Sequence, residues 1–173
     1  MDLLQDLRRK VPVVALIGSK IGCFGGMGFI AAATDVIVMS EFSRLGLTGP
    51  EVIEQEMGRN EFDASDRALV FRTTGGKHKF IMGDCNFLVG DTLADFRRQA
   101  QHVAQMSMIE IEGMRRIGSR GAVERQMKLV AFAADLRPRD STDMWKALGN
   151  KEPQQLIAAS EEEFQKIAVR WNA

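Results

Sequence analysis

The sequence of 173 residues has no surplus of charge of either sign. It contains 23 Lys and Arg residues against 23 Asp and Glu residues, so its formal net charge at pH 7 is zero. A protein dedicated to nucleic acid or to an anionic membrane surface is usually basic. We therefore expect a protein that binds no nucleic acid and no membrane.

Long apolar runs and cysteines are also scarce. The longest apolar run is interrupted by glycines and by Thr34 and Asp35, so no transmembrane helix is expected. The first residues include acidic side chains where a signal peptide would be basic. The two cysteines, Cys23 and Cys85, are too few for a disulfide framework. These absences predict a cytoplasmic protein in a reducing compartment.

Histidine and tyrosine are the rarest polar aromatic residues here, with two and none. His78 stands between Lys77 and Lys79, where we expect it to be exposed, and His102 stands within a predicted helix. No cluster of His, Cys and carboxylate residues has the spacing of a metal site, so none is predicted. Methionine is abundant instead, and its ten residues favour a role as flexible core filler.

The front half of the sequence alternates apolar runs with glycine-rich breaks. Leucines at helical spacing predict a short helix over residues 2–10, and the β-branched run Val11–Ile17 predicts a strand buried on both faces. The turn Gly22–Gly28, with four glycines, leads into a predicted helix of small residues, Met27–Thr34. Val36–Met39 predicts a second buried strand. This order predicts a βαβ unit.

Further local signals predict the remaining elements of this half. Gly49-Pro50-Glu51 predicts a helix start, because Pro suits the first helical position and Glu suits the positive end of a helix. Asp63 is expected to cap a second helix, Ala64–Phe71. Lys79–Met82 and Phe87–Val89 are predicted as strand edges around a turn.

From Thr92 onward the pattern is helical. Thr92 with Asp95 predicts a helix cap. Apolar residues at spacings of three and four predict one long helix to about Ile117. Further helices are predicted over Val123–Leu136, Ser141–Leu148 and Ser160–Trp171, the last with a capping box at its start. The predicted organisation is an α/β core over residues 1–91 and a helical C-terminal region over residues 92–173.

The glycine turn is the strongest candidate for a chemical site. The start of a helix presents unpaired N–H groups and a partial positive charge, and glycines allow a ligand to approach them. Gly25 and Gly26 stand where the strand hands over to the helix, so their N–H groups could form an oxyanion hole for a thioester carbonyl. The same turn would suit a phosphate, or close packing of helix on strand. The P-loop ending and GxGxxG are both absent from it.

Other candidate residues have a structural alternative that we favour. Cys23 lies near the predicted helix start, where a thiolate is stabilised, but without an evident base it is better interpreted as a packed thiol. The carboxylates Glu51, Glu54 and Glu56 could include an acid or base, although a solvated helix face is commoner. A basic stretch could receive an acidic carrier protein or phosphate groups, or could be a solvated helix face. It consists of Arg115, Arg116, Arg120 and Arg125.

Several segments together resemble a known family. They are Val11–Gly18, Gly22–Gly28 and Arg44–Glu56, continued by Glu61-Phe62-Asp63, Asp66-Arg67 and Gly75-Gly76. From about Val11 to Val89 the sequence is similar to the carboxyltransferase branch of the crotonase superfamily, and most similar to the beta subunit of biotin-independent malonate decarboxylase. The resemblance implies an α/β fold with a crotonase-like (ClpP/crotonase) spiral core and a helical C-terminal region. The core would be partial, because the family's beta subunits carry further strands before the segment that matches Val11.

The resemblance also implies an activity. In this family a beta and a gamma subunit act together as a carboxy-lyase on a malonyl thioester carried by an acyl carrier protein subunit. The carrier delivers a phosphopantetheine-type prosthetic group, and this chain would bind no cofactor of its own. Backbone N–H groups stabilise the enolate left after CO2 is released, a role that falls on Gly25 and Gly26. The residues implied to bind substrate are Cys23, Phe24, Met27, Gly49, Pro50 and Glu51.

Two other functions stay open. The chain could be a non-catalytic scaffold that binds a partner subunit through its methionine-rich helices. It could also be a component of a biotin-dependent acyl-CoA carboxyltransferase. All three hypotheses predict a hetero-oligomer.

Overall fold

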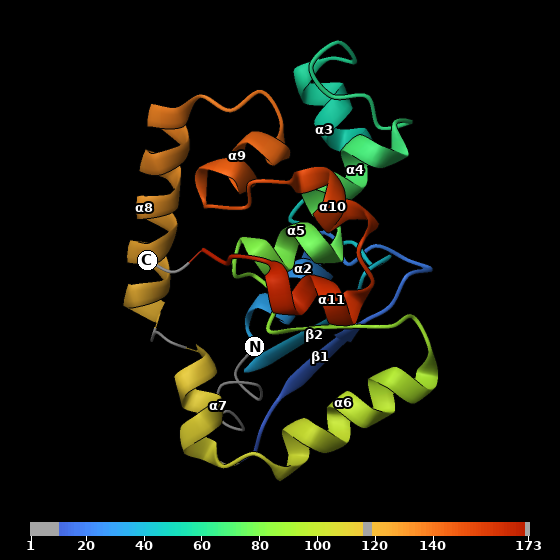
Figure 1. The fold of residues 1–173 in the computed structure, drawn as a ribbon, viewed down its shortest axis with the longest axis vertical. Helices are drawn as coiled ribbons and strands as arrows, with labels where there is room; N and C mark the ends of the chain where they lie inside the picture. The colour runs from blue at the N-terminus through green and yellow to red at the C-terminus, as the bar shows by residue number, and fades with distance from the viewer. Residues whose placement is uncertain (1–10, 116–118, 172–173) are drawn as a thin grey trace.

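The centre of the fold is a small parallel sheet. A computed structural model describes residues 11–115 and 119–171, so the helix predicted over residues 2–10 lies outside the described range. The strands β1 (Val14–Ile17), β2 (Val36–Ser40) and β3 (Phe87–Val89) lie in that order in the sheet. Figure 1 shows β1 and β2 side by side. Helix α2 (Gly26–Ala32) connects β1 to β2, and these two strands pair in parallel. The predicted βαβ unit is confirmed.

The prediction that the first strand is buried on both faces is wrong. Strand β1 stands at one edge of the described sheet, and the side chain of Leu16 is 50% exposed. Strand β2 lies in the centre, and all five of its residues are buried. A β-branched run favours a strand, but its position in the sheet depends on pairing partners that are distant in sequence.

Two helices follow the second strand. Helix α3 (Pro50–Met57) begins after Gly49 as predicted. The next helix, α4 (Arg67–Thr74), begins later than predicted, because Asp66 rather than Asp63 is its cap. The Asp66 carboxylate accepts a hydrogen bond from the N–H of Leu69 at 3.1 Å. Asp63 instead accepts from the N–H of Ser65 at 2.8 Å, which forms a local turn before the helix.

The predicted strand edge at Lys79–Met82 is wrong, because this segment lies in helix α5 (Gly76–Ile81). Gly76 explains how the helix fits: a Cβ atom there would lie 2.3 Å from the carbonyl oxygen of Ser40. The chain therefore turns directly into a helix that lies against the end of β2, with Phe80 and Ile81 buried. The strand preference of these two residues is overridden by this packing.

The single long helix predicted after Thr92 is two helices, α6 (Leu93–Gln105) and α7 (Met108–Arg115). Thr92 caps α6 as predicted, since its hydroxyl oxygen accepts from the N–H of Asp95. The break carries its own cap: the Ser107 hydroxyl accepts from the N–H of Glu110, whose carboxylate accepts from the N–H of Ser107 at 2.8 Å. This reciprocal pair is a capping box within the apolar repeat. The predicted end at Ile117 lies outside the described residues.

The last helices match the prediction in part. Helix α8 (Ser119–Leu136) ends before Pro138 as expected, and α9 (Ser141–Ala147) follows. Helix α10 (Pro153–Ala158) was not predicted. Helix α11 (Glu161–Ile167) begins at the predicted Ser160 cap but ends before Trp171.

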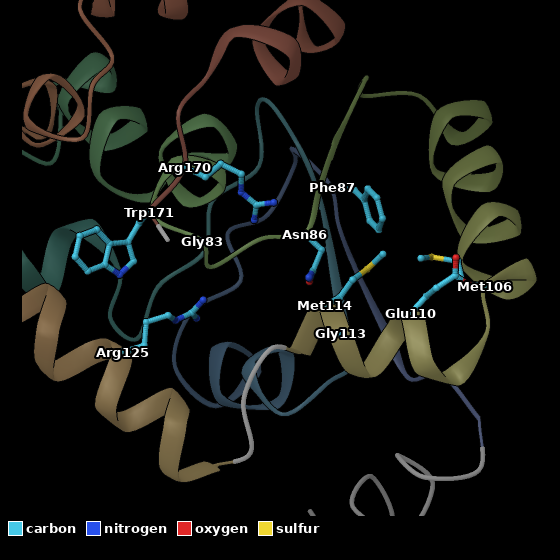
Figure 2. Close-up of a pocket in the computed structure, with 10 residues that line it drawn as sticks. All are labelled: Gly83, Asn86, Phe87, Met106, Glu110, Gly113, Met114, Arg125, Arg170 and Trp171. Carbon is cyan, nitrogen blue, oxygen red and sulfur yellow. The ribbon is translucent and has the colours of Figure 1, made fainter. Parts of the chain in front are cut away.

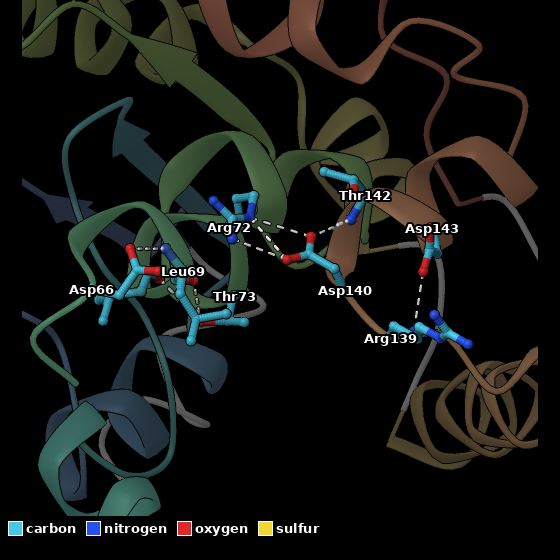
Figure 3. A network of polar contacts seen from close by, with 9 residues as sticks. Asp66, Leu69, Arg72, Thr73, Arg139, Asp140, Thr142 and Asp143 are labelled. Atoms are coloured by element: carbon cyan, nitrogen blue, oxygen red, sulfur yellow. Dashed lines mark hydrogen bonds and ion pairs between the residues drawn. The ribbon is translucent and has the colours of Figure 1, made fainter. Parts of the chain in front are cut away.

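The arginine of α4 ties the front half to the start of α9. The Nε of Arg72 donates to the Asp140 carboxylate at 3.0 Å, and its Nη2 lies 3.0 Å from the same group (Figure 3). Burial alone would raise the pKa of Asp140, but hydrogen bonds from the Thr142 N–H and from Arg72 bring that pKa below its usual value. The pair therefore stays ionised at neutral pH.

The main core is shared by both parts of the chain. Ile17 and Met39 of the sheet belong to the same buried cluster as Trp145 of α9 and Phe164 of α11. The alternate side chains of β2, Val36 and Val38, belong to a second cluster. That cluster also holds Val103 of α6 and Ile111 of α7. The predicted boundary near residue 91 stays a prediction: all three strands precede it, yet the core extends across it.

Candidate functional site

The glycine turn lies beside the second segment of the family resemblance. The N–H of Cys23 donates to the carbonyl of Arg44 at 2.8 Å, and the N–H of Gly46 donates to the carbonyl of Cys23 at 3.1 Å. The N–H of Gly25 donates to the carbonyl of Leu47 at 2.9 Å. Two motifs that are separate in sequence are thus joined by a short parallel backbone ladder.

Gly25 and Gly26 form the start of α2. Gly25 is the N-cap, with a φ of 59° that a side chain would strain, and Gly26 is the first helical residue. Within the described part of the chain no side chain caps this helix. A Cβ atom on either glycine would meet nothing within 4 Å, so the space above the turn is open. The orphan N–H groups of the first helical turn therefore face an accessible space.

The two glycines differ in the state of their N–H groups. Gly25 already donates to Leu47, whereas Gly26, as the first helical residue, has no carbonyl within the helix to receive its N–H. The oxyanion role of both glycines stays a prediction. In this conformation it falls on Gly26, and Gly25 would have to release Leu47 to take part.

The predicted substrate-binding residues of the turn have different surroundings. Cys23 is half-buried, and this burial raises the pKa of its thiol, so it is a neutral thiol at pH 7. The Phe24 ring covers Gly46, where an added Cβ would lie 3.1 Å from a ring carbon. Met27 is 59% exposed. Of the three side chains, Met27 offers the most surface to a ligand.

The second predicted group lies at the start of α3. Pro50 is buried there, and Glu51 is exposed. Among the described residues, the backbone hydrogen bonds of the glycine turn go to Arg44–Leu47 and not to Gly49–Glu51. The two groups are therefore connected through Leu47 rather than by direct bonds. Glu54 of the same helix has a structural partner, since its carboxylate accepts from the N–H of Ala64 at 2.7 Å.

The prediction that His78 is exposed is wrong. It lies in α5, and its Nδ1 accepts a hydrogen bond from the indole Nε1 of Trp145 at 3.1 Å, with the two rings stacked 6.2 Å apart. Burial, with the charge of Lys79 beside it, lowers the pKa of His78 to about 3. The imidazole is therefore a neutral acceptor in the packing of α5 on α9. The prediction rested on the two flanking lysines, but α5 turns His78 toward α9.

A hollow that no sequence motif predicted lies away from the glycine turn. It is a cavity of about 610 Å³ between α7, α8 and the residues after α11 (Figure 2). Asn86 and Phe87, at the start of β3, line it, so it opens at the amino end of the sheet, whereas the glycine turn follows the carboxyl end of β1. Of the predicted basic stretch, Arg125 lines this cavity. The side chains of Arg115, Arg116 and Arg120 lie outside the described residues.

Comparison with known proteins finds a relative along the whole chain. No family model matches it. Over all 173 residues, however, it is 58% identical to malonyl-S-ACP:biotin-protein carboxyltransferase MADC of Malonomonas rubra. The predicted resemblance to malonate decarboxylase is confirmed. The chain spans about half of that relative, 54% of its length.

Solved structures agree with this assignment. A Pseudomonas malonate decarboxylase hetero-tetramer in complex with malonate is 38% identical, with a TM-score of 0.57, over 60% of this chain and 38% of the matched chain. A Pseudomonas malonate decarboxylase MdcD-MdcE hetero-dimer is 34% identical over 60% of this chain and 42% of its own, with a TM-score of 0.49. The predicted crotonase-like fold with a helical C-terminal region is confirmed.

The described residues contain no group of three or more His, Cys, Asp or Glu side chains placed to hold a metal ion. Among the helices described, none is both long and apolar enough to cross a membrane.

Proposed function

We propose that this chain forms part of an enzyme that removes the free carboxyl group of a malonyl thioester carried by an acyl carrier protein. The observation that carries the proposal is the 58% identity to the malonyl-S-ACP carboxyltransferase over every residue of this chain. The matched region includes the open glycine turn at the start of α2. A carrier protein would bring the thioester on its phosphopantetheine-type arm, and this chain would bind no cofactor itself.

The proposed chemistry needs a stabilised enolate. When the C–C bond to the carboxylate breaks, CO2 leaves, and the electron pair moves into the thioester to give an enolate with its negative charge on oxygen. A proton then adds to the carbon to give the acetyl thioester. The N–H of Gly26 would donate a hydrogen bond to the enolate oxygen, where negative charge develops in the transition state.

The surroundings of the turn suit this role. The space next to Gly25 and Gly26 is open, so a thioester oxygen can approach the backbone. Met27 offers an exposed apolar side chain for the acyl arm, and Phe24 packs beneath the turn over Gly46. Cys23 would not act as a nucleophile, because its raised pKa keeps the thiol protonated. Gly49, Pro50 and Glu51 would border the pocket from the start of α3.

A hetero-oligomer is part of the proposal. A solved relative is a malonate decarboxylase hetero-tetramer. We propose a gamma-type subunit and an acyl carrier protein as the partners of this chain.

A second candidate differs only in the fate of the carboxyl group. The curated relative is named for transfer from malonyl-S-ACP to a biotin protein. In that reaction the enolate forms in the same way, and the carboxyl group bonds to a biotin nitrogen, which loses its proton. A proton adds to the enolate carbon to give the acetyl thioester. The glycine turn would serve both reactions equally.

Malonyl-S-ACP labelled in its free carboxyl group tests the proposal and separates the two candidates. The assembled complex containing this chain should release the label from the thioester. Label in the gas phase supports decarboxylation, and label on a biotin protein, dependent on adding that protein, supports transfer. A complex that assembles fully but leaves the label on malonyl-S-ACP with either acceptor would contradict both and favour a scaffold.

A further inference from the structure

The cavity at the amino end of the sheet has two unlike walls. Arg125 of α8, Arg170 and Trp171 line one side, and Figure 2 shows both arginine side chains extending toward the space between the walls. Phe87 and Met114 line the opposite side. A volume of about 610 Å³ is in the size range of small-molecule sites. An organic anion could place its charged group against the cationic wall and its apolar body against the apolar wall.

The cationic wall contains donors without partners. Among the described residues, the buried Nε of Arg125 and the buried indole Nε1 of Trp171 have no hydrogen-bond acceptor. Arg125 also forms no ion pair with any residue that the structure describes. Buried donors are nearly always paired, so two unpaired ones beside one cavity indicate that an acceptor is absent.

The remaining polar groups are fixed in place by the fold. Arg170 lies over the Phe80 ring, 4.2 Å from its centroid, and donates to the carbonyls of Phe80 and Cys85 at 3.0 and 2.7 Å. The Asn86 amide oxygen accepts from the N–H of Ile37 at 2.8 Å, which orients its NH2 group as a further donor. These contacts hold the wall in one geometry before any ligand binds, which lowers the entropic cost of binding.

One acidic residue lines the cavity on the apolar side. Figure 2 shows Glu110 next to Met106, across the space from the two arginines. Its carboxylate already accepts from the N–H and hydroxyl of Ser107, both at 2.8 Å. Glu110 therefore serves the cap of α7 and does not neutralise Arg125.

We propose that this cavity binds an organic phosphate. The phosphate group would lie against Arg125 and its neighbouring donors, and an apolar body would lie against Phe87 and Met114. Guanidinium groups match phosphate oxygens in pairs, and a phosphate monoester carries more charge than a carboxylate, which suits a wall with two arginines. The site is separate from the glycine turn and does not depend on the proposed function.

Calorimetric titration of the full chain with phenyl phosphate tests the proposal, with phenylacetate and inorganic phosphate as comparison probes. Phenyl phosphate should bind more tightly than either, because only it carries both the phosphate and the apolar body. No saturable binding at millimolar concentration would overturn the proposal. Equal binding of phenylacetate would overturn the choice of phosphate, and equal binding of inorganic phosphate would overturn the role of the apolar wall.

Two pairs of variants locate the site. Arg125→Gln removes the charge of a residue without described partners, and it should weaken phenyl phosphate binding by about tenfold or more. Lys128→Gln, on the exposed side of the same helix, should leave binding unchanged. Gly113→Leu should block the cavity, since a Cβ at Gly113 meets nothing within 4 Å, whereas Gly113→Ala should not. Unchanged binding in both Arg125→Gln and Gly113→Leu would place the ligand elsewhere and overturn the proposal.

Discussion

Gly25 and Gly26 are neighbours that lack a side chain for different reasons. Gly25 has a positive φ of 59°, in a region that other residues enter only with strain. Gly26 has ordinary helical geometry, and the space beside it is open. The fold therefore requires glycine at the first position and does not require it at the second.

This difference predicts opposite effects of alanine on stability. Gly25→Ala should lower the free energy of unfolding by about 1–3 kcal/mol, because the backbone cannot relax at the helix start. Gly26→Ala should leave it unchanged or raise it by up to about 1 kcal/mol, because alanine favours the helix. Urea unfolding of the two variants measures both. Equal losses of unfolding free energy in the two variants would show that the positive φ of Gly25 does not decide the effect of alanine.

His78 predicts a dependence of stability on pH. Its pKa in the folded chain is about 3, against an ordinary value of 6.5, so between these values the unfolded chain binds a proton that the folded chain does not. Stability from this residue is therefore fully present above pH 6.5 and is lost as the pH falls toward 3. His78→Asn, which keeps an acceptor for Trp145 but does not titrate, should reduce this loss by up to about 1.4 kcal/mol per pH unit.

Urea unfolding at several pH values between 4 and 7 measures this loss in the unmodified chain and in His78→Asn. A profile for His78→Asn that matches the unmodified chain would mean that His78 titrates normally.

At the scale of elements, several helix starts with local signals were predicted correctly, although Asp66 and not Asp63 caps α4. Thr92 and Ser160 cap their helices as expected, because a cap depends on residues within one turn. Helix α5 was mistaken for a strand, since its place depends on the close approach of Gly76 to Ser40. The same limit applies to the sites. The glycine turn is continuous in sequence, whereas the cavity joins residues as distant as Gly83 and Trp171.

The contact between α4 and α9 should carry more stability than an ion pair within a surface segment. Arg72→Ala should lower the free energy of unfolding by about 1–2 kcal/mol, because both partners are mostly buried and are joined by several hydrogen bonds. Arg59→Ala should have little effect, because the exposed Arg59 pairs with Asp63 and Ser65, which are close to it in sequence. Chemical unfolding of both variants compares them. An equal effect of the two changes would contradict the structural role of the Arg72–Asp140 pair.

For the whole molecule, the shared core predicts unfolding as one unit. Trp145 and Phe164 of the helical region pack in the same cluster as Met39 of the sheet, and all three are almost fully buried. Circular dichroism, which reports on all helices, and tryptophan fluorescence, which reports on Trp145 and Trp171, should therefore give one coincident transition. Two separated transitions would instead support independent domains on either side of residue 91.

At the scale of the whole molecule, the proposed catalysis belongs to an assembly of subunits. This chain spans about half of its curated relative, and a solved relative is a hetero-tetramer. The glycine turn should therefore be tested within the assembled complex, where the thioester and the other subunits are present.

The most direct test is the turnover number of that complex on malonyl-S-ACP with Gly26→Val in this chain. The valine side chain would fill the open space beside the Gly26 N–H, so kcat should fall by about 10²–10³, the cost of losing one oxyanion donor. Gly18→Ala, where the new Cβ makes only an ordinary contact with Phe96, should keep its activity. A complex that assembles normally with Gly26→Val and keeps full turnover would contradict the role of the glycine turn.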